Sequence, residues 1–206
     1  MVSKTSVNAE RAGEAFSGMV PILPTMMNGV AMEKKYSIGQ TIIYSQSGIC
    51  SVEAITENEF YGERTEYYVL RPLYDAGSLI YVPIENETLV SRIRSAMTKD
   101  EVDGILDYMP NAENIWIDND NKRREAYSEI LLANEPRRMT EMIKTLRSRR
   151  EEQISKKKRL HISDEHLLER AQRILCDEIS YVLGVDRNAI DSYIVGHIEK
   201  IEKKDA

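Results

Sequence analysis

The residues of this chain that could carry chemistry gather behind its single tryptophan, Trp116. Residues 122–160 contain 13 Lys and Arg against 6 Asp and Glu, a net charge of +7, although the formal net charge of the whole chain is −6. The flanking segments are acidic, with 7 basic against 13 acidic residues in 33–110 and 6 against 10 in 161–206. A basic block between acidic segments indicates a local contact with an anionic partner, such as nucleic acid.

Trp116 admits two interpretations. Tryptophan buries a large surface, so the residue could simply pack between helices. Alternatively it is a wedge, because apolar side chains can insert at base steps and aromatic rings can stack on bases. A polar run, Asp118 to Asn121, and then the basic residues follow Trp116 directly. We therefore expect Trp116 to be a partly exposed wedge.

Lys122, Arg123 and Arg124 fall in the first turn of a predicted helix, where each exposed cation opposes the helix dipole at a cost of roughly 0.3–1 kcal/mol. An external anion would remove this cost, whereas a solvated face with Glu125 and Glu129 nearby is the alternative. Both interpretations stay open. With the basic residues further along the chain, the candidate DNA-binding set is Trp116, Lys122, Arg123, Arg124, Arg147, Arg150, Lys156, Lys157, Lys158 and Arg159.

Motifs for catalysis are absent from the sequence. It contains no phosphate-binding glycine loop, no HExxH and no CxxC, and His161, His166 and His197 lack the spacing of metal ligands. The two cysteines, Cys50 and Cys176, are far apart and fit small core residues in a reducing compartment. We expect no catalytic residue, no metal, no cofactor and no enzymatic activity; an enzyme with a diffuse active site is the weaker alternative.

The first half of the chain is typical of a small β-barrel. Short apolar stretches rich in β-branched and aromatic residues are separated by turn signals, with Gly39, Gly48 and Gly62 at the turns. The predicted strands are residues 40–45, 49–55, 65–73 and 78–84.

The second half has helical periodicity. The capping box from Thr98 to Glu101 predicts a short helix that ends at Pro110. Apolar stripes then predict further helices, the third of them with Ser163 as its N-cap and Gly184 as its stop. These helices span residues 121–132, 136–149, 163–183 and 187–203.

The expected architecture is therefore α+β, a small β-barrel followed by a compact α-helical domain. Residues 1–32 are expected to be a disordered extension, residues 33–90 the barrel and residues 91–206 the helical domain. There is no apolar run long enough to span a bilayer and no signal-peptide pattern, so we expect a cytoplasmic protein.

Four sequence features together resemble the CarD/CdnL family of bacterial transcription regulators, whose barrel is similar to the polymerase-interacting module of transcription-repair coupling factor. They are the opening YSIGQTIIYSQSGICSVEAI, the strand pair TEYYVL and LIYVPIEN, the lone tryptophan with a basic helix behind it, and the late helix LLERAQRILCDEIS. The resemblance covers about residues 35–185.

The resemblance implies an SH3/Tudor-like barrel that binds the β subunit of RNA polymerase. It also implies that the helical domain contacts promoter double-stranded DNA near the upstream edge of the melted region. There Trp116 would wedge into the minor groove and tune open-complex stability. A monomer with weak sequence specificity is expected. The polymerase-facing positions would be Glu57, Asn58, Tyr67, Ile80 and Tyr81. The alternative is a Tudor/SH3-like protein-binding adaptor without DNA binding.

Overall fold

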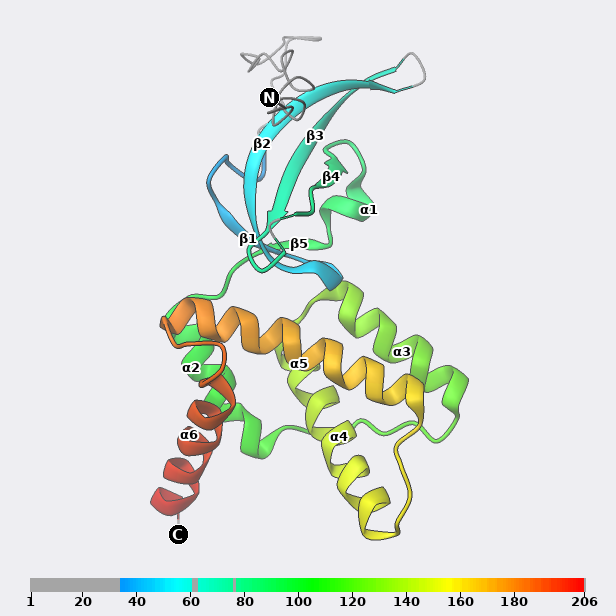
Figure 1. Ribbon diagram of the computed structural model, residues 1–206, viewed down its shortest axis with the longest axis vertical. Helices are drawn as coiled ribbons and strands as arrows, with labels where there is room; N and C mark the ends of the chain where they lie inside the picture. The colour runs from blue at the N-terminus through cyan, green and yellow to red at the C-terminus, as the bar shows by residue number, and fades with distance from the viewer. Residues whose placement is uncertain (1–33, 61–62, 76, 206) are drawn as a thin grey trace, which may run out of the picture.

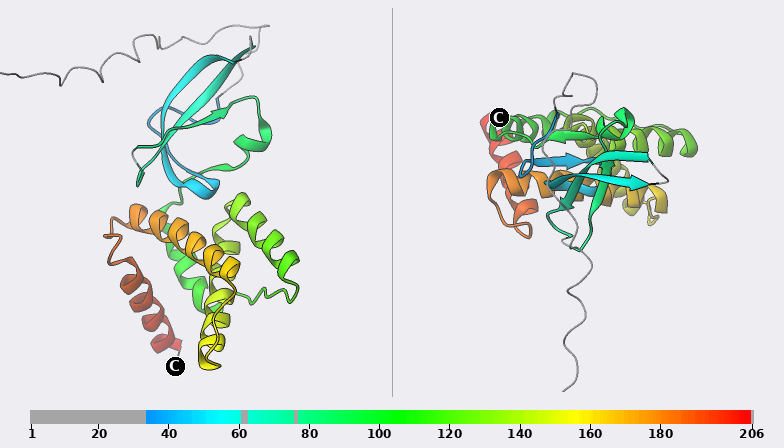
Figure 2. Two further views of the ribbon diagram at one scale, coloured as in Figure 1. Left: turned by 45° about the vertical axis from the view of Figure 1, so that its right-hand side comes forward. Right: turned by 90° about the horizontal axis from the view of Figure 1, so that it is seen from above.

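A curved antiparallel sheet stands on a group of helices in the computed structural model, which describes residues 34–60, 63–75 and 77–205 (Figure 1). The same stacking is visible after a turn of 45° (Figure 2). The expected α+β class, a β domain followed by helices, is confirmed. The expected disordered extension, residues 1–32, and the expected turn residue Gly62 lie outside the described residues.

The sheet has five strands in the order β4-β3-β2-β1-β5. All four predicted strands are present, and Gly39 and Gly48 have positive φ angles of 84° and 73°, as their predicted turns require. β2 is the longest strand and bends at a register shift between Val52 and Ala54. The strands are β1 (Thr41–Tyr44), β2 (Gly48–Phe60), β3 (Glu63–Pro72), β4 (Ile80–Pro83) and β5 (Ile93–Ser95); a short 3-10 turn, η1 (Ser45–Ser47), joins β1 to β2.

The fifth strand was not predicted. β5 has only three residues, too few for an alternating pattern to be read, and it pairs with β1 through Ile42↔Ser95 and Tyr44↔Ile93. The one-turn helix α1 (Glu87–Val90) precedes it, capped by the Asn86 side chain. The sheet thus extends past residue 90, where the helical domain was expected to begin.

The helices follow the predicted order. The Thr98 capping box is present, with Glu101 bonded back to the backbone and hydroxyl of Thr98. Gly184 ends its helix in the left-handed conformation, as predicted. The helices are α2 (Lys99–Tyr108), η2 (Met109–Asn111), α3 (Asp120–Ala133), α4 (Pro136–Ser155), α5 (Ile162–Leu183) and α6 (Ile190–Asp205).

Two helix boundaries differ from the prediction. The N-cap of α5 is His161 rather than Ser163, because the His161 ring nitrogen Nδ1 accepts the Ser163 backbone N–H at 3.3 Å. α4 continues to Ser155, more than one and a half turns beyond the predicted end at residue 149. The extra turns have no apolar stripe, and a half-buried Arg149–Glu152 pair and a more exposed Lys156–Glu152 pair accompany them instead.

Strand β1 is buried on both faces. Ile42 faces the core of the barrel and the next residue, Ile43, faces the helices, because successive side chains of a strand point to opposite sides. Ile43 and Ile49 share one apolar core with Tyr127 of α3 and Ile174 of α5. The sheet and the helices are therefore packed together through a common core.

Among the described residues, no helix combines the length and apolarity needed to cross a membrane.

Candidate functional site

Trp116 lies in the connection between η2 and α3, where its side chain is half-buried. Its indole Nε1 donates to Asp118 Oδ1 at 2.9 Å. The guanidinium carbons of Arg123 and Arg149 lie 4.1 and 4.4 Å from the centroid of the ring, within cation–π range. The ring also packs against the core that the sheet and helices share. Trp116 is thus anchored on one side and leaves part of its surface to solvent.

Arg123 is not available to phosphates. Only 2% of it is exposed, so the expectation that it contacts DNA from the first turn of the helix is wrong. Its Nε and Nη2 donate to the two carboxylate oxygens of Asp164, at the start of α5, at 3.1 and 2.7 Å. Both side chains of this pair are 2% exposed. Arg123 therefore joins the first turn of α3 to the first turn of α5.

The remaining N–H groups of Arg123 hold the chain next to Trp116. Nη1 donates to the Ile117 carbonyl at 2.6 Å and more weakly to the Asp118 carbonyl, and Nη2 donates to Asp120 at 2.8 Å. With the Asp164 bonds, each of the three guanidinium nitrogens has at least one acceptor, as a buried arginine requires. Arg123 is thus the residue that fixes the loop carrying the tryptophan.

The sequence contained a signal for this role. Arg123, Tyr127 and Leu131 are spaced by four residues and are the buried residues of α3. The same spacing extends the apolar stripe of α3 back to Arg123 and so predicts that this residue is buried. Arg149 was missed for the same reason, since it continues the inner face of α4 one turn beyond Thr145. Nothing in the sequence identified Asp164 as the partner, because the contact spans 41 positions.

Most of the other candidate cations are exposed. Arg150 pairs with Glu165 at 3.1 Å and Lys156 with Glu152 at 2.6 Å. The other exposed members form no ion pair within the described part of the chain; they are Lys122, Arg124, Arg147, Lys157, Lys158 and Arg159.

These cations are divided between two regions. Lys122 and Arg124 flank the buried Arg123 in the first turns of α3, and residues 156–161 form the connection between α4 and α5. Arg149, which contacts Trp116, precedes that connection by seven residues, about 10 Å along the helix axis. The cations beside Trp116 and those of the connection thus belong to the same end of the helical domain.

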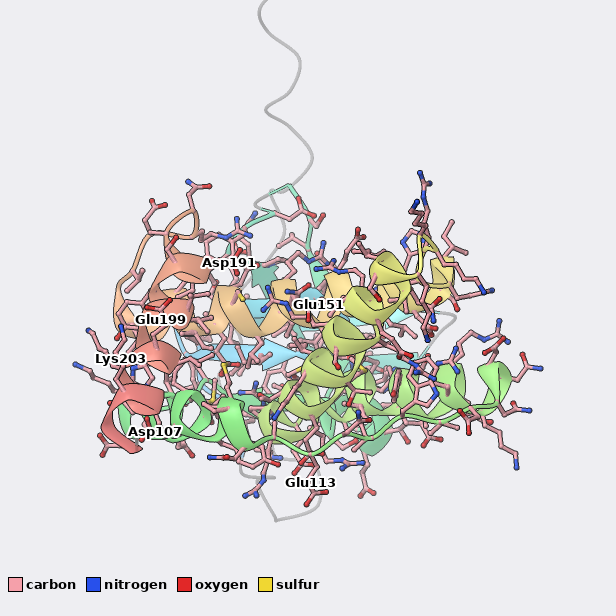
Figure 3. All side chains as sticks on the ribbon, turned by 90° about the horizontal axis from the view of Figure 1, so that it is seen from below. Asp107, Glu113, Glu151, Asp191, Glu199 and Lys203 are labelled. Carbon is pink, nitrogen blue, oxygen red and sulfur yellow. The ribbon has the colours of Figure 1, made fainter. Side chains whose placement is uncertain are left out.

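Arg147 lies elsewhere. It lines a groove of about 310 Å³ between α4 and α6, together with Glu151, Ile194 and Ile198. Seen from below, Glu151 lies on α4, and the acidic Asp191 and Glu199 lie along α6 (Figure 3). The structure therefore does not bring Arg147 together with Trp116.

The five positions expected to face polymerase lie on strands β2, β3 and β4, but on two different faces of the sheet. Ile80 packs against the core of the barrel, and Glu57 follows Ile55 of that same face by two residues. Asn58, Tyr67 and Tyr81 lie on the opposite face. A single binding surface can therefore contain Asn58, Tyr67 and Tyr81, but it cannot contain all five side chains.

Tyr67 and Tyr81 form the centre of that second group. Their rings meet edge to face with centroids 6.3 Å apart, and Tyr81 is 39% exposed. Tyr81 belongs to β4, which is an edge strand of the sheet. An aromatic pair at a sheet edge is a common kind of protein-binding surface.

The thiols fit the expected core role. Burial raises the pKa of Cys50 to about 12 and is also the main cause that raises the pKa of Cys176 to about 11. At neutral pH both thiols are therefore protonated and weakly nucleophilic. Within the described residues, no three His, Cys, Asp or Glu side chains are placed to hold a metal ion.

Comparisons with known proteins agree with this organisation. Residues 36–94 match the CarD-like/TRCF RID domain, and residues 104–195 match the CarD C-terminal domain. The chain is also 24% identical over 158 residues to the proposed transcription factor YdeB of Bacillus subtilis, which covers 77% of this chain and 99% of YdeB. The first match ends within β5, in agreement with the observed extent of the sheet.

Proposed function

The chain belongs to the CarD-like family of transcription regulators, and from this premise we propose that it binds the RNA polymerase β subunit and promoter DNA together, and so tunes the stability of the open complex. In this proposal the sheet is the polymerase anchor. The end of the helical domain that carries Trp116 contacts DNA near the upstream edge of the melted region.

The observation that carries the proposal is the setting of Trp116. A half-buried indole, held by Asp118, Arg123 and Arg149, lies at the same end of the helical domain as exposed cations that form no ion pair within the described residues. A fixed aromatic ring in the same region as exposed cations suits a contact in which the ring meets bases and the cations meet phosphates.

The phosphate contacts are assigned to the exposed cations rather than to Arg123. Lys122 and Arg124 on α3, with Lys157, Lys158 and Arg159 in the α4–α5 connection, would supply them. Contacts of this type give affinity without reading sequence, which supports weak sequence specificity.

The proposed mechanism is a population shift. Inserting a side chain at a base step costs a few kcal/mol of stacking in a closed duplex, but this stacking is already lost at a melted fork. Trp116 would therefore bind the open state better than the closed state and prolong its lifetime. Anchoring on polymerase lets this contact be weak by itself, because tethering raises its effective concentration at the promoter.

The test is the lifetime of promoter open complexes, measured with competitor DNA after polymerase, promoter and the regulator have assembled. The parent should lengthen this lifetime in a concentration-dependent way, and Trp116→Ala should lose the effect while still co-purifying with polymerase. Tyr193→Ala is the matched control, because Tyr193 is a 40% exposed aromatic on α6. It should behave as the parent.

An unchanged lifetime with the parent, or a Trp116→Ala variant as active as the parent, would overturn the proposal. A parent that binds polymerase but never shifts a promoter duplex would instead support the protein-binding adaptor.

A further inference from the structure

The junction between the sheet and the helices contains a buried carboxylate, Glu178 of α5, which is 0% exposed. It accepts two hydrogen bonds from Arg94 of β5, from Nη1 at 2.6 Å and from Nη2 at 2.5 Å. It also accepts the backbone N–H of Met97, just after β5, at 2.8 Å. Three donors from the end of the sheet thus converge on one side chain of a helix.

Arg94 contacts a third element as well. Its Nε donates at 2.7 Å to the carbonyl of Asn134, the left-handed residue that ends α3. A planar guanidinium with a bidentate partner on one side and a carbonyl on another has little rotational freedom. Arg94 therefore ties β5 to both α3 and α5.

The shared apolar core could hold the sheet on the helices without this pair, but it would specify their orientation less sharply. Ile43 and Ile49 of the sheet pack against Ile174 of α5, and burial of this kind is non-directional. The Thr41 and Tyr181 hydroxyls, 3.0 Å apart, add one exposed polar contact. Of these interactions, the Arg94–Glu178 pair is the one that is directional and has a fully buried carboxylate, with Arg94 itself 23% exposed.

We infer that Glu178, through Arg94, is a positioning residue that fixes the orientation of the sheet relative to the helices, so that the β4 edge and Trp116 act as one rigid unit. The inference rests on the proposed function, in which these two sites bind different partners of the same promoter complex. With a loose junction each partner would still bind, but binding of the sheet to polymerase would no longer present the tryptophan in a defined direction.

The first experiment measures the orientation without any partner. Spin labels are placed on cysteines introduced at Thr88 in α1 and Glu129 in α3, both exposed, with Cys176 replaced by serine in all variants. The parent should give one narrow distance distribution by pulsed electron resonance. Glu178→Gln removes the charge at nearly constant size and should broaden or split this distribution.

The matched control is Glu53→Gln. Glu53 also forms a bidentate pair with an arginine, Arg71, but that pair joins two strands within the sheet. The control should keep the narrow distribution. If the circular dichroism signal shows that Glu178→Gln does not fold, Arg94→Lys takes its place, since lysine keeps the positive charge but cannot form the two parallel hydrogen bonds of a guanidinium.

The second experiment measures the consequence in the full promoter complex. Glu178→Gln should bind polymerase and promoter duplex separately as the parent does, while the effect on open-complex lifetime falls by roughly two- to thirtyfold. A narrow distance distribution in both Glu178→Gln and Arg94→Lys would overturn the inference. A broadened distance distribution that leaves the effect on open-complex lifetime unchanged would overturn it as well. If the parent itself has no effect on lifetime, the proposed function fails, and the distance measurement still decides whether the junction is rigid.

Discussion

Arg123 and Asp164 lie 41 positions apart in the chain and form a bidentate ion pair in which both side chains are 2% exposed. The pair brings the beginnings of α3 and α5 together and leaves Arg123 stacked on Trp116. A residue that resembles a phosphate ligand in the sequence is thus a structural support for the neighbouring aromatic ring. Several outcomes of mutagenesis depend on this difference.

Removal of Arg123 should destabilise the protein strongly. Arg123→Ala leaves the Asp164 carboxylate buried without its partner, and breaking a buried pair from one side typically costs about 3–5 kcal/mol. Denaturant unfolding followed by circular dichroism measures this loss. Lys122→Ala, one residue earlier and exposed, is the control and should stay within about 0.5 kcal/mol of the parent. Equal stability of the two variants would contradict the supporting role of Arg123.

Truncation of Trp116 should have an intermediate effect on stability. A fully buried tryptophan costs about 3–5 kcal/mol when cut to alanine, but Trp116 is only half-buried, so Trp116→Ala should cost about 1–3 kcal/mol and leave the chain folded. Trp116→Phe keeps an aromatic ring for Arg123 and Arg149 but loses the bond to Asp118, and should cost less. Calorimetric melting compares the three proteins. A Trp116→Ala variant that fails to fold would show that the residue serves mainly the core.

DNA affinity should depend on salt through the exposed cations alone. If roughly 3–6 phosphates are neutralised, the logarithm of affinity should fall with the logarithm of salt concentration with a slope of about −3 to −5. Arg124→Ala should make the slope shallower by about 1, and the double change of Lys157 and Lys158 to alanine by about 2. Fluorescence anisotropy with a promoter duplex at several salt concentrations gives these slopes. A slope near zero for the parent would favour the adaptor function.

The two thiols should react very slowly in the folded protein. Burial raises the pKa of Cys176 to about 11 from a usual 9.0, so its thiolate at pH 8 is roughly a hundredfold scarcer than that of an exposed cysteine. Cys50, with a pKa of about 12, should be slower still. Alkylation by iodoacetamide, followed by mass spectrometry, should accelerate as the pH rises toward 11 and on unfolding. Rapid labelling of Cys176 at pH 8 would indicate that α5 and α6 separate readily.

Much of the fold was predictable because its signals are local. The capping box at Thr98, the left-handed Gly184 and the apolar repeats of α3 and α5 depend on residues within a few positions of one another. The positions of Trp116 and of the exposed cations behind it could likewise be identified from residue type and spacing. Local sequence signals therefore predict the α+β order of elements and the segment in which to look for an anionic partner.

Contacts between distant segments determine which of those residues are exposed and able to bind a partner. Residue type does not separate Arg123 from its basic neighbours Lys122 and Arg124, and although its spacing to Tyr127 places it on the buried stripe, only the fold supplies the carboxylate that it meets on a distant helix. Strand β5 and the Glu178 junction exist only because β1 and α5 supply their partners. Such contacts join segments 41 to 84 positions apart, and no local pattern encodes them, because the free energy of a buried ion pair or a strand edge depends on the partner that folding brings to it.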